Sequence, residues 1–125
     1  MRDILFRAKW LYNNDWREGY FIEWSDGSCS IETGRPDKPT YCVDPATVGQ
    51  YTGLTDKNGK RIFEGDIVDV DGYAYACRWD GGNVEFGLYN KYESIGIAYI
   101  GTFNIEIIGN IHDNPELLEG GVTDG

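Results

Sequence analysis

The chain has 125 residues, a length that fits one domain with a single core, and its hydrophobic content of 41% excludes a wholly disordered protein. Acidic residues outnumber basic ones by 21 to 11, and the whole excess lies in residues 63–125, which hold twelve acidic and two basic residues. This charge repels the phosphates of nucleic acids and favours solubility or a basic partner.

No apolar run has the length or setting of a signal peptide or of a membrane span. The three cysteines, Cys29, Cys42 and Cys77, have neither the even number nor the spacing of a disulfide framework or a zinc site. We therefore expect a reduced, cytoplasmic protein without a membrane partner.

The first predicted hairpin turns at an Asp-Gly dipeptide at positions 26–27, where apolar residues alternate on both sides. A two-residue loop there pairs Trp24 with Cys29 and Ile22 with Ile31, so that these four side chains share one face.

The next segment, residues 33–40, has two prolines and no periodicity, which predicts a loop or a hinge. Residues 44–47 predict a single helical turn. We expect one domain over the whole chain, with an N-terminal β sub-region at about 1–48, a barrel-like sub-region at about 49–119 and a frayed tail at 120–125.

An Asn-Gly dipeptide at positions 58–59 predicts a second two-residue turn, which places Asp56 opposite Arg61 and Leu54 opposite Phe63. The chain then bends through a glycine into a strand that follows directly.

A Gly-Gly dipeptide at positions 81–82 predicts a third hairpin, with Arg78 opposite Glu85 on one face. Its apolar pairs share the other face: Trp79 with Val84, Cys77 with Phe86, and Tyr75 with Leu88. This register makes Cys77 a core side chain.

Two more strands are expected at residues 95–100 and 103–108, the second too apolar for an exposed edge. Asn114 then caps at most one short helix that begins at Pro115.

Three stretches of the chain, residues 50–68, 107–118 and 4–10, resemble the YopX family of phage and prophage proteins. The resemblance rests on the words Tyr-Thr-Gly-Leu, Asp-Lys-Asn-Gly and Glu-Gly-Asp-Ile-Val in this order. It implies a small, mainly β fold in which antiparallel hairpins form a barrel-like sheet, a bacterial cytoplasm as the place of action, and no established activity or catalytic residues.

An inventory of reactive side chains does not favour an enzyme or a cofactor. His112 is the sole histidine, and no nucleophile motif or Gly-rich phosphate loop occurs. Four carboxylates form a candidate acidic patch and have the ligand type of a metal site: Glu64, Asp66, Asp69 and Asp71. Their alternation along a strand favours a solvated turn over a cation site.

Aromatic and basic side chains gather near the N-terminus, in residues 7–24. The candidate partner-binding residues are Arg7, Trp10, Tyr12, Trp16 and Arg17. Such side chains are enriched at protein interfaces, which favours a non-catalytic module that binds a protein, either a host factor or copies of itself as a homo-oligomer. The alternative is an accessory protein that stacks single-stranded nucleic acid on this segment.

Overall fold

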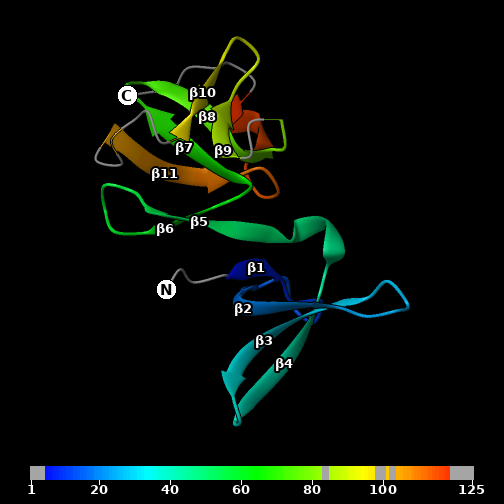
Figure 1. The fold of residues 1–125 in the computed structure, drawn as a ribbon. Coiled ribbons are helices and arrows are strands. Elements are labelled where there is room, and N and C mark those ends of the chain that lie inside the picture. Colours follow the sequence, from blue (N-terminus) through cyan, green and yellow to red (C-terminus); the bar gives the residue numbers. More distant parts are fainter. Residues whose placement is uncertain (1–4, 83–84, 98–100, 102–103, 119–125) are drawn as a thin grey trace. The chain divides into compact units, whose positions relative to one another are not determined.

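The computed structural model describes residues 5–82, 85–97, 101 and 104–118 of the chain (Figure 1). The protein is mainly β, with antiparallel strand pairs throughout, as the hairpin signals predict. It forms two compact units, residues 1–51 and 52–125, which are described separately below. Within the described residues, no helix is long and apolar enough to cross a membrane.

The first unit is a sheet with the strand order β4-β3-β2-β1-β5. Its elements follow in chain order: β1 (Phe6–Lys9), β2 (Trp16–Glu23), β3 (Cys29–Arg35), β4 (Lys38–Val43), the 3₁₀ turn η1 (Pro45–Thr47) and the start of β5 (Gly49–Thr55). Trp10, just past β1, forms an isolated antiparallel bridge to Val43 at the end of β4. The chain after β1 therefore lies beside β4, the strand at the far end of this order. Asp44 caps the predicted helical turn, which is thereby confirmed.

One face of this sheet carries the core of the first unit. Ala8, Cys29, Ile31 and Val43 are all at most 5% exposed. Partly buried hydrophobic residues pack against them: Phe6, Phe21, Tyr41 and Val48. Strand alternation sends the neighbouring side chains to the other face.

The hairpin at positions 26–27 has a different register from the one predicted. Trp24 and Ser28 close a three-residue loop through a 2.8 Å N–H to O bond, and Gly27 takes φ +89° at its end. Phe21 therefore lies opposite Ile31, while Ile22 lies opposite Ser30. The predicted pairs of Trp24 with Cys29 and Ile22 with Ile31 are wrong, because one extra loop residue moves one strand by one position and exchanges its faces.

Residues 33–40 form the tip of a hairpin instead of the predicted loop or hinge. Arg35 pairs with Lys38 across a two-residue turn, and a register shift between Glu32 and Arg35 accommodates Gly34 at φ +78°. This bulge breaks the alternation that a regular strand would show in the sequence.

The second unit contains a five-stranded sheet in the order β10-β9-β8-β7-β11. Its elements are β6 (Arg61–Phe63), which pairs with β5, then β7 (Asp66–Val70), β8 (Tyr73–Asp80), β9 (Glu85–Tyr89), β10 (Ser94–Gly96), β11 (Ile105–Asn110) and the 3₁₀ turn η4 (Pro115–Leu118). Among the strands that the structure describes, this order does not close on itself into a barrel.

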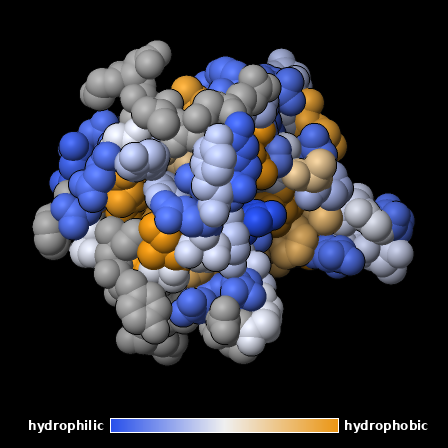
Figure 2. Space-filling model, turned by 90° about the horizontal axis from the view of Figure 1, so that it is seen from above, coloured by the Kyte–Doolittle hydropathy of each residue, from blue (hydrophilic) through white to orange (hydrophobic). Residues whose placement is uncertain are grey.

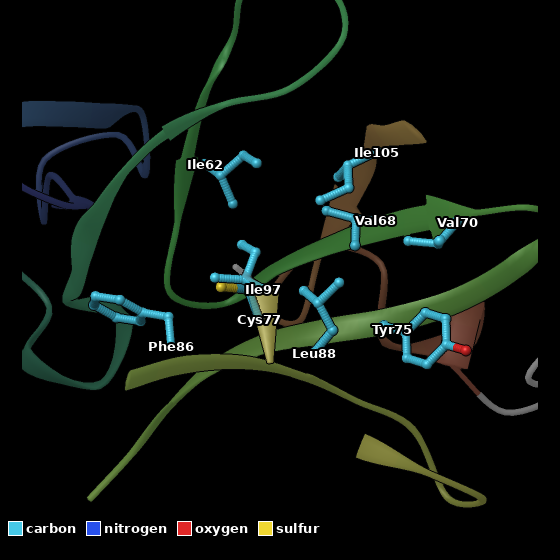
Figure 3. Close-up of a cluster of buried hydrophobic side chains, with 9 residues drawn as sticks. All are labelled: Ile62, Val68, Val70, Tyr75, Cys77, Phe86, Leu88, Ile97 and Ile105. Atoms are coloured by element: carbon cyan, nitrogen blue, oxygen red, sulfur yellow. The ribbon is translucent and has the colours of Figure 1, made fainter. Parts of the chain in front are cut away.

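The core of the second unit draws side chains from β6, β7, β8, β9 and β11. Figure 3 shows nine of them gathered together: Ile62, Val68, Val70, Tyr75, Cys77, Phe86, Leu88, Ile97 and Ile105. Cys77 is 0% exposed, which confirms its prediction as a core residue.

The turn at positions 58–59 repeats the loop geometry of the first hairpin. The Asp56 N–H bonds to the Lys60 carbonyl at 2.8 Å, and Gly59 takes φ +82°. The predicted opposition of Asp56 to Arg61, and with it that of Leu54 to Phe63, is wrong by one residue for the same reason.

The hairpin at positions 81–82 is also longer than predicted, by two residues. Cys77 lies opposite Leu88 and Trp79 opposite Phe86, whereas Arg78 lies opposite Gly87 and not Glu85. A shift of two preserves the faces, so Tyr75, Cys77, Phe86 and Leu88 still share the core, although their partners change. Val84 lies outside the described residues.

The last two predicted strands are partly observed. β10 ends at Gly96, and β11 confirms a strand over most of 103–108; residues 98–100 and 102–103 lie outside the described part. β11 ends the strand order, but its outer edge is covered by the turn after β5. The Lys57 N–H donates to the Ile105 carbonyl at 2.9 Å and the Asp56 carboxylate accepts the Ile107 N–H at 3.0 Å, so the strand is not an exposed edge. The short C-terminal helix is the 3₁₀ turn η4.

Candidate functional site

The five candidate binding residues of the N-terminal segment do not form one surface. Arg7 and Lys9 lie over the Trp16 ring, at 4.6 and 5.5 Å from its centroid. Lys9 is opposite Trp16 in the sheet, so these three side chains share the face that points away from the core of the first unit.

Arg17 lies on the opposite face. Its guanidinium stacks on Trp10 at 4.8 Å and on Tyr41 at 4.9 Å, and Tyr41 packs on the core. Tyr12 contacts the Trp10 ring at 4.9 Å and is 81% exposed. The structure thus divides the predicted cluster into two cation–π groups on two faces.

The face of β2 that points away from the core carries a surface that the sequence reading did not select. We call it the Tyr20 face and define it by Glu18, Tyr20, Trp24 and Glu32. Tyr20 and Trp24 are 57% and 50% exposed. Glu32, which is exposed, lies directly opposite Tyr20, and Glu18, two positions before Tyr20 on the same strand, lies opposite Arg7 on this same face.

Two contacts fix the end of the Tyr20 face. The Trp24 indole N–H donates to the Ser30 hydroxyl at 2.9 Å, which holds the ring over β3. Ser30 in turn lies opposite Cys42, which is exposed. The signal that could have found this face was the alternation Glu18, Tyr20, Ile22 along β2, which is visible in the sequence once the strand register is known.

The four predicted acidic residues are not gathered into a patch. Asp66 is 1% exposed and accepts the Phe63 N–H at 2.7 Å, so it stabilises the bend between β6 and β7. Asp69 lies opposite Glu106 in the sheet, Asp71 occupies the tip of the next turn at φ +52°, and Glu64 is half-buried. Asp66 therefore belongs to the folded interior and not to an acidic surface.

Within the described residues, no three His, Cys, Asp or Glu side chains come close enough to hold a metal ion. His112 is exposed in the turn after β11, where its N–H donates to the Asn110 side chain at 3.0 Å. On the face drawn in Figure 2, hydrophobic side chains appear in separate areas among hydrophilic ones.

These features define a small, mainly β protein of two compact units with an aromatic and acidic sheet face. The family model described as YopX protein matches residues 5–119, and the chain belongs to the YopX family. Comparison with curated proteins found no match. The chain is also similar to a solved structure, "Crystal structure of protein EF1440 from Enterococcus faecalis", at 25% sequence identity and a TM-score of 0.59, with 95% of this chain and 100% of that chain covered.

Proposed function

We propose that this protein is a phage- or prophage-encoded accessory protein that acts in the bacterial cytoplasm as a non-catalytic binding module. Its partner is a protein that presents basic side chains to the Tyr20 face. The observation that carries the proposal is that two exposed aromatic side chains, Tyr20 and Trp24, lie on the face of the sheet where Glu32 is directly opposite Tyr20.

This combination suits Arg and Lys side chains of a partner. An aromatic ring attracts a cation over its face, and a nearby carboxylate adds a charge-assisted hydrogen bond. Tyr and Trp are also the residue types that most often dominate the binding energy of protein interfaces. Because Trp24 is held by Ser30, little side-chain entropy is lost when a partner covers it.

The alternative, binding of single-stranded nucleic acid, is less well supported by the same surface. Glu32 lies opposite Tyr20, where its carboxylate repels a phosphate. The rings of Trp16 and Trp10, which would stack bases, already have guanidinium groups over them. Association of two copies through the Tyr20 face is the remaining form of protein binding.

The test is a capture from bacterial lysate, with and without nuclease, followed by binding measurements on the purified prey. Tyr20→Ala is the informative bait, and Tyr73→Ala is its matched control, since Tyr73 is 51% exposed on the second unit. We expect a nuclease-resistant protein that binds the wild type and Tyr73→Ala equally and Tyr20→Ala about tenfold more weakly.

Two results would contradict the proposal. A prey that binds Tyr20→Ala as tightly as the wild type would remove the Tyr20 face from the interaction. A catch that disappears with nuclease, and that Trp16→Ala and Arg17→Ala both weaken in a salt-dependent way, would instead assign the protein to nucleic acid.

A further inference from the structure

The second unit contains an open pocket of about 350 Å³ on the face of β8 and β9 opposite the core. Ala76 and Arg78 reach it from β8, and Tyr89 from β9. Ile111 and Leu118 line it from the turn after β11 and from η4, which contacts β8. The volume lies at the small end of the range for ligand sites in proteins.

The pocket concentrates the positive charge of the acidic half of the chain. Arg78 and Lys91 are the two basic residues among residues 63–125, against twelve acidic ones, and both line this one pocket. An anion near the pocket is therefore attracted locally and repelled by most of the surrounding surface.

The guanidinium of Arg78 has a defined position. It lies 4.4 Å from the centre of the Tyr89 ring, and the Tyr89 hydroxyl is bonded to the Asp80 carboxylate. Stacking on a ring fixes the plane of a guanidinium and leaves its edge for a bidentate bond to a carboxylate or a phosphate.

The loop that carries Lys91 is also held in place. The Asn90 amide donates to the Ala74 carbonyl at 3.3 Å and accepts the N–H groups of Tyr92 and Glu93, each at 2.9 Å. Asn90 therefore acts as a positioning residue for the backbone of its neighbour Lys91.

The remaining lining is apolar, from Ala76, Ile111 and Leu118, and this decides the class of ligand. We infer that the pocket binds a monoanionic carboxylate attached to a small apolar group, with the carboxylate on Arg78 and Lys91 and the apolar group against the three aliphatic side chains. A phosphate dianion is disfavoured, because it would gain no apolar contact and would meet twice the repulsion from the acidic surroundings.

The test uses the full-length chain and its two-dimensional NMR spectrum. The probes are isocaproate, N-acetyl-leucine, its neutral amide and inorganic phosphate. We expect both carboxylates to shift the amide resonances of Ala76, Tyr89 and Asn90, and the neutral amide to bind about tenfold more weakly or worse. If N-acetyl-leucine binds more tightly than isocaproate, the natural carboxylate is the carboxyl end of a peptide. If the two bind equally, it is a free acid.

Three variants test which basic side chains bind the carboxylate. Arg78→Gln should weaken carboxylate binding about tenfold, Lys91→Gln should weaken it in the same direction, and Arg61→Gln, an exposed arginine outside the pocket, should leave it unchanged. The spectra themselves show whether each variant is folded. The inference is overturned if no pocket resonance moves at millimolar probe, if the neutral amide or phosphate binds as tightly as the carboxylates, or if both pocket variants bind like the wild type.

Discussion

The Asp56 carboxylate ties the turn after β5 to the edge of β11. One oxygen accepts the N–H groups of Asn58 and Lys60, both at 2.9 Å, and the other accepts the Ile107 N–H at 3.0 Å. The side chain is 4% exposed. Burial by itself raises the pKa of Asp56, but the three N–H bonds outweigh burial, and the pKa is lowered from its ordinary value.

Replacing this carboxylate should destabilise the protein. Asp56→Asn turns one acceptor into a donor that faces a backbone N–H, which we expect to cost about 1–3 kcal/mol in the free energy of unfolding at pH 7, measured by urea denaturation. Asp37→Asn is the control, because Asp37 makes an exposed ion pair with Arg35 at 3.3 Å. Equal stability of Asp56→Asn and the wild type would contradict the role given to the carboxylate.

The same residue predicts a dependence on acid. Because the pKa of Asp56 is lower in the folded chain than in the unfolded chain, its stabilisation is present above about pH 4 and is lost as the pH falls through the folded value. The stability difference between wild type and Asp56→Asn should therefore shrink on acidification below about pH 4. A difference that stays constant down to the acid transition would argue against this linkage.

Tyr75 gives the stability of the protein a pH dependence of the opposite sign, at alkaline pH. Burial first, and then the hydrogen bond to the Glu93 carboxylate, raise the pKa of Tyr75 to about 12. The folded state thus keeps a proton that the unfolded chain releases near pH 10, and stability falls as the pH rises from about 10 to about 12. Tyr75→Phe should reduce this alkaline loss, measured by denaturation at several pH values, and leave the part that comes from Tyr89 and Cys29, whose pKa values are also raised. Tyr73→Phe should retain the full loss. An alkaline loss of the same size in Tyr75→Phe and in the wild type would contradict the role given to Tyr75.

At the scale of elements, the turn dipeptides located the hairpins but not their registers. Asp-Gly and Asn-Gly favour two-residue loops, yet here each glycine ends a three-residue loop at positive φ. Both loop types use the same residues, so the sequence alone does not separate them. The error matters because one residue exchanges the two faces of a strand, whereas the two-residue error at positions 81–82 left the core assignment intact.

The shared loop geometry makes a prediction about two glycines. Gly27 and Gly59 have φ of +89° and +82°, and a Cβ added at either would contact nothing within 4 Å. Gly27→Ala and Gly59→Ala should therefore each cost about 1–2 kcal/mol through backbone strain alone, as measured by thermal and chemical denaturation. Gly81→Ala, in the third hairpin, is the control, since its φ lies outside this region. A neutral effect at both sites would mean that these loops adopt another geometry.

Gly19 shows how closely β2 approaches β3. A Cβ at this position would lie 2.4 Å from the Glu32 carbonyl oxygen, a backbone atom that cannot rotate away. We expect Gly19→Ala to destabilise the first unit by about 1–3 kcal/mol, more than Gly81→Ala, whose added Cβ meets its nearest atom at 4.0 Å. Equal stability of the two variants would show that the strands can separate at little cost.

At the scale of the whole molecule, composition and family words predicted what does not depend on register: a mainly β chain of the YopX family. The sequence predicted a boundary between two sub-regions near residue 48, and the boundary between the compact units of the structure lies between residues 51 and 52. The binding surface was not predictable in the same way. Trp16 and Arg17 are neighbours in sequence but lie on opposite faces, and only the strand pairings show that Tyr20 and Glu32 are neighbours.

Cys42 is an exposed thiol beside the Tyr20 face that can be labelled chemically. Cys29 and Cys77 are 5% and 0% exposed, and burial raises the pKa of the Cys29 thiol, whereas Cys42 is exposed beside Ser30, which binds Trp24. A maleimide should therefore modify the folded protein once, Cys42→Ser not at all, and the unfolded chain three times, as read by mass spectrometry. More than one label on the folded protein would contradict the buried positions. A fluorophore attached to Cys42 would then report, without any engineered residue, when a partner arrives on this side of the sheet.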